Sequence, residues 1–140
     1  MSAFDPLIQS KIDVIDAIEQ GAAAVDAFHA PEVGPTDYDA LDFPYIQVLP
    51  ENTTDQGGNE FQHQVRLNCY FERDRGDAYT DYLRAVGDAT TNALAALSDE
   101  PSVVSFRPTT IEDYAGELNG TLILLVSVQV SVGTLVDLGA

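Results

Sequence analysis

The side chains that could do chemistry in this sequence are few, and their spacing keeps them apart. His63 and Cys69 fall on the same face of a predicted strand, six residues from one another. At about 3.3 Å per residue they are about 20 Å apart, too far for a nucleophile and its base. We therefore interpret Cys69 as a small core residue and His63 as a half-buried strand position. His29 has no carboxylate or histidine at metal-site spacing, and we interpret it as a loop residue.

Three carboxylates, those of Asp37, Asp39 and Asp42, crowd one polar segment and are the candidate ligands for a metal ion. Carboxylates in such a cluster can hold Ca²⁺, Mg²⁺ or Na⁺. The EF-hand spacing fails, because Leu41 stands where an oxygen ligand is needed. The alternative is a solvated acidic surface, which is the usual role of such a cluster in a salt-adapted protein. We therefore expect no metal and no other cofactor.

Signatures of enzymes are missing from the sequence. The patterns Gly-x-Ser-x-Gly, His-Glu-x-x-His and Cys-x-x-Cys do not occur. Gly57 and Gly58 are not followed by a helix that opens with Lys-Ser/Thr, so they do not form a phosphate-binding loop. The tripeptide Arg75-Gly76-Asp77 stands where a helix should begin, and a turn with a helix cap explains it. We expect no enzymatic activity.

The charge of the chain is strongly one-sided. Twenty-three acidic residues stand against six basic ones, which gives a net charge of −17, and Lys11 is the only lysine. The acidic residues are scattered rather than collected in runs, which indicates a folded surface adapted to molar salt, where the Debye length falls to about 3 Å. We infer a halophilic archaeon or one of its viruses as the source; the alternative is an ordinary acidic protein. The chain has few basic side chains that could release counterions from a nucleic acid, which argues against binding to a phosphate backbone.

The bulk composition predicts one globular domain over residues 1–140. The apolar fraction of 45% is typical of a globular protein, and one cysteine excludes an intramolecular disulfide. Residues 122–132 are apolar but too short to span a bilayer. The N-terminus lacks the basic and apolar regions of a signal peptide, so we expect a soluble protein made inside the cell, with no membrane partner.

Hydrophobic periodicity predicts two helices. The first begins at Asp5, which can cap it, and ends near Gly21. Its apolar stripe is Ile8, Ile12, Ile15 and Ile18, and extended structure is expected near residues 25–28. The second helix follows Asp77 and ends at Ser98. Its expected apolar positions are Tyr79, Leu83, Val86, Thr90, Ala93, Leu94 and Leu97.

Alternating patterns predict four strands, at residues 43–49, 61–71, 103–114 and 121–132. Pro50 is expected to close the first of them, and Asn119-Gly120 predicts a tight turn between the last two. The element order predicts an α+β fold, a four-stranded mainly antiparallel sheet with both helices packed on one face and a long C-terminal hairpin. The other face of the sheet is only partly polar, which predicts a partner that covers Tyr70, Ile123 and Leu125.

The layout of these elements resembles the tail-terminator (tail-completion) proteins of long-tailed viruses. The likeness rests on an opening amphipathic helix, the Pro-bounded strand DFPYIQVLPE, the strand VRLNCYFERD, the helix AYTDYLRAVGDATTNALAAL and the final hairpin phrase GELNGTLILLVSVQV. It implies a structural protein of the virion, assembled in the host cytoplasm and located at the head-proximal end of the tail. Such a protein forms a ring, typically hexameric, that caps the tail tube and joins it to the head–tail connector or neck protein. DNA passes through the lumen, and no cofactor is needed.

Two segments are the predicted contact regions. Residues 31–42 form a long polar loop, and the tip of the last hairpin has little to bury within one copy. The residues predicted to contact another subunit or the tube are Tyr38, Phe43, Tyr45, Glu117, Asn119 and Gly120. Two alternatives stay open: a neck or connector adaptor of the same virion, and a small halophilic α+β domain that binds a ligand or regulates another protein. The oligomeric state discriminates the tail-terminator ring and the neck adaptor from the small α+β domain.

The charge pattern predicts that salt stabilises the fold. Because −17 charges repel one another on one small domain, the melting temperature should rise steeply from dilute buffer to molar KCl. Circular dichroism melts over a KCl series measure this. A melting temperature that does not change with salt would contradict the interpretation of the surface.

Overall fold

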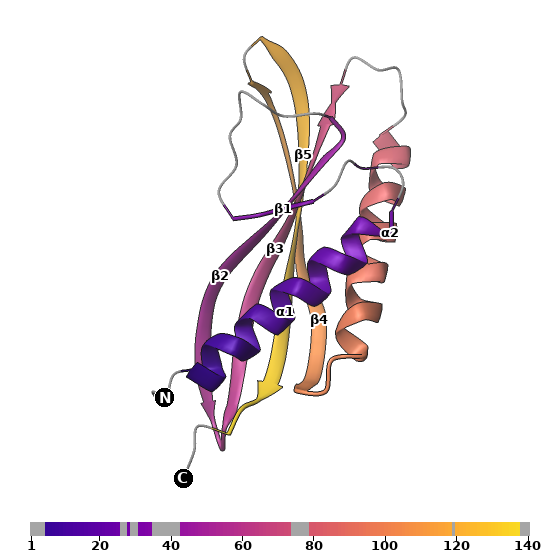
Figure 1. Cartoon of the computed structure of the whole chain (residues 1–140). Coiled ribbons are helices and arrows are strands. Elements are labelled where there is room, and N and C mark those ends of the chain that lie inside the picture. The colour runs from indigo at the N-terminus through magenta and orange to yellow at the C-terminus, as the bar shows by residue number, and fades with distance from the viewer. Residues whose placement is uncertain are drawn as a thin grey trace.

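The computed structural model describes residues 5–25, 28, 31–34, 43–73, 79–118 and 120–137. Its elements are α1 (Asp5–Ala23), β1 (Glu32–Val33), β2 (Tyr45–Gly57), β3 (Glu60–Glu72), α2 (Tyr79–Ser98), β4 (Val103–Leu118) and β5 (Thr121–Leu135). The strands form one sheet in the order β1-β2-β3-β5-β4, and both helices lie on one face of it (Figure 1). The predicted fold class, with four antiparallel strands and two helices, is confirmed.

Two short segments differ from the prediction. The two-residue strand β1 pairs parallel with Gln47 and Val48 of β2, inside the stretch predicted to be a loop. Extended structure is not found at the described residues of the stretch 25–28: Val25 donates its N–H to the carbonyl of Ala22, and Phe28 donates to that of Val25. The side chains of Val25 and Phe28 are buried.

The first hairpin is longer than predicted. β2 continues through Pro50 to Gly57, so the expected end at Pro50 is wrong. A proline is tolerated there because β2 pairs with β1 only at Gln47 and Val48, which leaves Pro50 on a free stretch of edge in the described part of the chain. Gly58 and Asn59 then form a two-residue turn with φ of 63° and 65°, as the twist of a tight hairpin demands.

The central strands supply most of the core. The predicted inward face of β3 is confirmed, since its six alternating residues are all buried, from Phe61 to Phe71. The inward face of β5 is likewise buried from Leu124 to Val132, whereas Leu122 near the tip is 42% exposed. β5 also continues to Leu135, beyond the predicted end of this strand at residue 132.

The buried faces of the helices match the predicted ones only in part: Ile18, Val86, Ala93 and Leu97 are buried as predicted, whereas other predicted positions are exposed. In α1, Ile8 and Ile12 are 56% and 43% exposed, and the buried residues are Ser10, Val14, Ala17, Ile18, Gly21 and Ala22. In α2, Tyr79 and Leu83 are exposed, and the buried residues are Tyr82, Val86, Ala89, Ala93 and Leu97. Periodicity favours the largest aliphatic side chains as core, but here small residues point inward because the two helices contact each other closely.

The two helices are in close contact at Gly21. A Cβ atom added at Gly21 would lie 2.4 Å from the backbone oxygen of Asn92 and 2.6 Å from Cα of Ala93. These are backbone atoms of α2, which cannot move aside as a flexible side chain could. The absence of a side chain at Gly21 therefore sets the separation and rotation of α1 against α2.

The helices are shorter than the sheet that they cover. α1 and α2 have 19 and 20 residues, which at 1.5 Å per residue gives about 30 Å. β4 and β5 have 16 and 15 residues, which at about 3.3 Å per residue gives about 50 Å. The hairpin of β4 and β5 consequently extends beyond the helical layer (Figure 1).

The packing predicts opposite effects for two glycine substitutions in helices. Gly21→Ala should lower the free energy of unfolding by roughly 2 kcal/mol or more, because its methyl group overlaps the backbone of α2. Gly87→Ala, in α2, meets no atom within 4 Å and should raise it by up to about 1 kcal/mol through helix propensity. Denaturant unfolding in molar KCl compares the two. Equal effects would show that the helices are not in close contact at Gly21.

Candidate assembly surfaces

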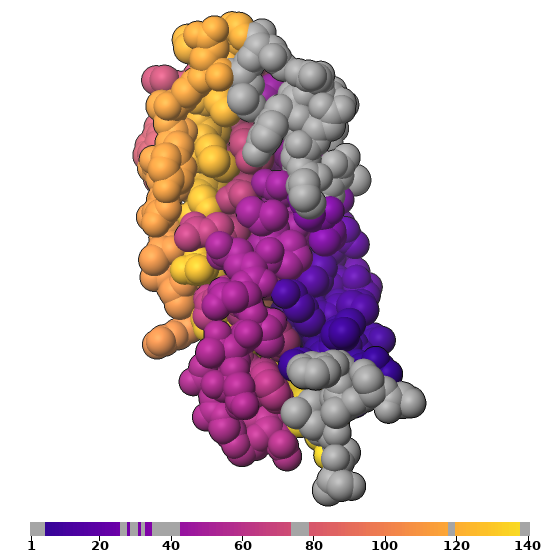
Figure 2. Space-filling view, turned by 90° about the vertical axis from the view of Figure 1, so that its left-hand side faces the viewer, coloured from indigo at the N-terminus to yellow at the C-terminus, as the bar shows by residue number. Residues whose placement is uncertain are grey.

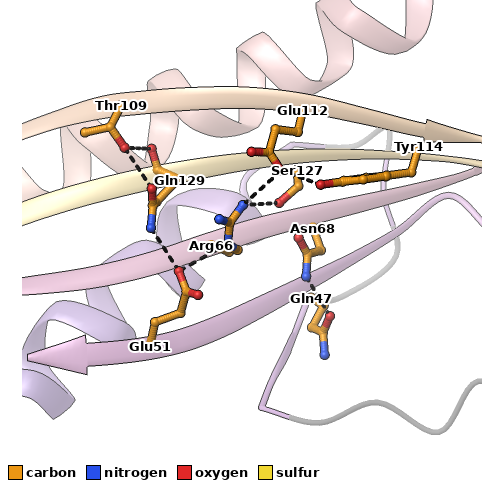
Figure 3. Close-up of polar contacts among 9 residues, drawn as sticks. All are labelled: Gln47, Glu51, Arg66, Asn68, Thr109, Glu112, Tyr114, Ser127 and Gln129. Carbon is orange, nitrogen blue, oxygen red and sulfur yellow. Dashed lines mark hydrogen bonds and ion pairs between the residues drawn. The ribbon is translucent and has the colours of Figure 1, made fainter.

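One arginine on the open face of the sheet joins its four long strands. Arg66 of β3 lies 3.2 Å through Nε from a carboxylate oxygen of Glu51 in β2 (Figure 3). Its Nη1 donates to the hydroxyl of Ser127 in β5 at 3.2 Å and lies 3.8 Å from Glu112 in β4. Because the side chain of Arg66 is 24% exposed, each contact is worth at most about 1 kcal/mol. Its charge also offsets the repulsion between the carboxylates of Glu51 and Glu112.

Amides and hydroxyls extend this polar network along the sheet. Gln129 donates to Glu51 at 3.1 Å and accepts from Thr109 at 3.2 Å (Figure 3). Further along, Ser131 accepts from Gln64 and donates to Gln62. The same face carries a shallow polar hollow of about 490 Å³, lined by Thr54, Gln56, Gln62, Gln64, Ser105, Phe106, Arg107 and Ser131. This part of the face is polar and internally hydrogen-bonded, unlike an apolar docking surface.

The apolar part of the open face is covered by the chain itself. Tyr45, Tyr70 and Ile123 are 4%, 4% and 7% exposed, and Phe43 and Leu125 pack against them. Gln47 accepts hydrogen bonds from Asn68 and from the hydroxyl of Tyr70, and donates to the carbonyl of Gly34. The cluster is thus tied to the segment that leads into β2. A partner is not required to bury Tyr70 and Ile123, in contrast to the prediction from the sequence.

β4 is the most exposed element. It pairs with β5 alone in the described residues, so its outer edge is open. None of the β4 side chains that the structure describes is buried, and the apolar residues Val104, Ile111 and Tyr114 are 51%, 66% and 53% exposed. Seen from the β2 edge, β4 and α1 lie on opposite flanks (Figure 2). An edge strand of this length is a ready site for association with another chain.

An apolar groove lies where α2 passes beside β4. It measures about 370 Å³ and is lined by Leu83, Val86, Gly87, Thr90, Thr91, Leu94, Pro108, Ile111 and Val128. No lining residue is ionisable, although the chain carries a net charge of −17. Sequence reasoning missed this groove, because Leu83 and Leu94 were assigned to the buried stripe of the helix. Gly87 lies between Leu83 and Leu94 in the sequence, and the lack of a side chain there is the signal that could have suggested a groove.

The structure describes only some of the residues that the sequence predicts to bind a metal ion or a partner. Asp37, Tyr38, Asp39, Asp42 and Asn119 lie outside the described residues, as does His29. Tyr45 is buried in the cluster with Tyr70, and Phe43 is half-buried beside it. Glu117 and Gly120 are exposed at the tip of the last hairpin, next to the end of the cluster formed by Ile123 and Leu125. An interface role for these residues stays a prediction.

The candidate reactive side chains are interior. Cys69 is fully buried, as expected, and burial raises the pKa of its thiol to about 12. His63 is 1% exposed, so its interpretation as half-buried is wrong.

No group of three metal-binding side chains occurs among the residues that the structure describes. None of the described helices has the length and apolar character that crossing a bilayer requires.

His63 sits in a chain of buried hydrogen bonds between the sheet and α1. Its Nδ1 lies 2.9 Å from the hydroxyl of Thr53, and its Nε2 lies 2.9 Å from that of Thr134. Ser10 of α1 donates to the Thr134 hydroxyl at 3.1 Å. Burial, with a smaller contribution from the charge of Lys11, lowers the pKa of His63 to about 4. The imidazole is therefore neutral at pH 7 and serves as a structural hydrogen-bonding group.

Comparisons with known proteins find matches among solved structures. No protein-family model matches the chain, and no curated protein does. Among solved structures, a chain from the "Virion of native gene transfer agent (GTA) particle" matches with a TM-score of 0.45 and 15% identity. The match covers 85% of this chain and 93% of that chain. A likeness at this level carries no functional conclusion by itself.

The pKa of His63 predicts how stability depends on pH. Between pH 6.5 and about 4 the unfolded chain binds a proton on His63 that the folded chain does not. The free energy of unfolding should therefore fall as the pH drops through this window, by up to about 3 kcal/mol from this residue.

His63→Gln isolates that contribution, because glutamine keeps polar contacts but does not titrate. Urea unfolding in molar KCl, at pH 7 and pH 4.5, should show wild type losing more stability than the variant. If both proteins lose the same amount, His63 does not titrate in this window.

Proposed function

We propose that this chain is a structural protein of a virion that assembles with copies of itself into a ring. In this proposal the ring caps the tail tube at its head-proximal end and contacts the tube protein on one side and the head–tail connector or neck protein on the other. The supporting layout is the order helix, strand, strand, helix, strand, strand, with the long final hairpin. The observation that carries the proposal is β4, a strand of 16 residues that is open along its edge and has no fully buried side chain among those described.

An exposed strand beside an apolar groove favours an assembly protein over an enzyme. Monomeric proteins protect long edges with charges, bulges or covering elements, because an open edge invites pairing with other chains. β4 does carry bulges near Val103 and Pro108, but it also exposes Ile111 and Tyr114. A surface of this kind is expected to be covered in the assembled state.

The polar face of the sheet suits a surface past which DNA moves. The positive charge of Arg66 is held between Glu51 and Glu112, and neighbouring amides bond to one another. Such a face offers little attraction to phosphate, and the net charge of −17 repels it. In the proposed ring this face is the one that lines the lumen.

The proposal predicts that the purified chain forms closed rings once its charges are screened. In molar KCl, sedimentation velocity and mass photometry should show one discrete oligomer, and negative-stain electron microscopy should show particles with a central hole. Transfer to dilute buffer should dissociate them, because unscreened copies repel one another. A monomer or dimer at every protein and salt concentration would overturn the ring and favour a small binding domain. A neck adaptor would instead form rings that bind the connector but not the tube.

A further inference from the structure

The polar hollow on the open face of the sheet is built from two successive rows of paired strand residues. In the first row, Gly133 of β5 lies between Ser105 of β4 and Gln62 of β3. The second row is Arg107, Ser131 and Gln64. Amides, hydroxyls and one guanidinium therefore share a patch of about 490 Å³, and none of its lining residues is acidic although the chain carries 23 acidic residues.

Gly133 allows two hydrogen-bond donors to approach one another. A Cβ atom at Gly133 would lie 2.4 Å from Oγ of Ser105 and 3.0 Å from Nε2 of Gln62, so both side chains lean over the backbone of β5. Because Oε1 of Gln62 accepts from Ser131, the amide is oriented with its NH₂ group toward Gly133. Neither that NH₂ group nor the Ser105 hydroxyl has a hydrogen-bond partner in the described part of the chain. Both are thus free to bind a ligand.

Arg107 is an unpaired cation beside these donors. It is exposed and forms no ion pair with the residues that the structure describes, whereas Arg66 and Arg84 each contact a carboxylate. Arg73 forms none either, but its hollow is lined by two tyrosines, an alanine and a leucine, with no amide among them. In so acidic a chain, an external anion meets the least competition at Arg107.

The donors select a carboxylate as the ligand. The guanidinium of Arg107 presents its N–H groups in a rigid fork that matches the two oxygens of a carboxylate, and the amide and hydroxyl add further donors. Glu60 limits the charge of the ligand, because its Oε1 lies 3.3 Å from the same Cβ position at Gly133. A carboxylate carries one negative charge, whereas a phosphate monoester carries about −1.5 to −2 at pH 7 and is repelled more strongly.

We propose that this hollow is a binding site for a carboxylate group, which Arg107 holds together with the amide of Gln62 and the hydroxyl of Ser105. The carboxylate belongs to a small organic acid or to an acidic side chain of another protein, and the contact has the same chemistry in both cases. The site lies within one copy of the chain, so it stands independently of the proposed ring.

Potassium acetate is the simplest probe of this site. Saturation-transfer NMR, observed on the methyl protons of acetate, measures the affinity whatever the oligomeric state of the protein. Molar KCl is present throughout, so that chloride occupies any place that recognises negative charge alone. We expect saturable binding of acetate under these conditions. No binding, or displacement of acetate by phosphate at an equal or lower concentration, would overturn the proposal.

Substitutions of Arg107 test the guanidinium. Arg107→Gln should weaken acetate binding by about 10-fold or more, the effect of losing hydrogen bonds to a charged group. Arg107→Lys keeps the charge but lacks the fork, so it should also lose most of the affinity. Arg84→Gln is the matched control, an exposed arginine outside the hollow, and should bind acetate like wild type. Undiminished binding by Arg107→Lys would show that charge alone attracts acetate, and the carboxylate site would be wrong.

Gly133→Ala tests the pair of donors. Its methyl group overlaps the ends of two side chains that can move aside, so the fold should persist while the donors are pushed apart. Acetate binding should fall by about 10-fold. Gly116→Ala, in β4, meets no atom within 4 Å and is the matched control. Ser105→Ala removes one donor from an exposed position and should weaken binding by about 5-fold, which keeps the test available if Gly133→Ala is unstable. Wild-type affinity in a folded Gly133→Ala and in Ser105→Ala would rule out the donor pair.

A competing peptide distinguishes the two sources of the carboxylate. The peptide acetyl-Gly-Glu-Gly-amide carries a single carboxylate on a side chain. If it displaces acetate at about 10-fold lower concentration than unlabelled propionate does, the site recognises a protein side chain. Displacement by peptide and propionate at equal concentrations would assign the site to a small organic acid. A peptide that binds without displacing acetate, together with failure of propionate to displace it, would show that acetate is not held as a carboxylate and would overturn the site.

Discussion

The close packing of α1 against α2 at Gly21 is the constraint on which the rest of the structure depends. Backbone atoms of Asn92 and Ala93 occupy the space that a side chain at position 21 would need. The two helices are therefore drawn together over the middle of the sheet, and they are only about 30 Å long. A hairpin of about 50 Å cannot be covered by such a layer, which leaves β4 and the hairpin tip exposed.

The electrostatics of the chain are organised around the few cations that it has. Arg66 pairs with both Glu51 and Glu112 on the open face, and Lys11 donates to the backbone of β2 from α1. In the interior, where a charge would be costly, His63 stays neutral and links the sheet to α1 through hydroxyl groups. The acidic residues are left mainly to the surface, where salt screens them.

The acidic background governs any association of this chain with itself. With −17 charges on 140 residues, two copies repel one another until salt screens their charges. The same background explains why the proposed ring would depend on salt and why its lumen would not hold DNA.

The sequence by itself determined the element order, the inward faces of β3 and β5 and the final hairpin. Strict alternation from Phe61 to Phe71 and the Asn-Gly turn are local signals, and local signals survive without knowledge of neighbours. The tertiary structure alone decided which helix faces are buried, because that depends on Gly21 meeting Ala93, a contact between residues far apart in the chain. It also decided the partners of Arg66 and the walls of the groove, which are set by strand register and by the path of α2. The periodic pattern selects large apolar side chains as core, whereas close packing buries the side chains that fit between the helices. Ile8 and Ile12 were therefore expected in the core, but they lie on the surface.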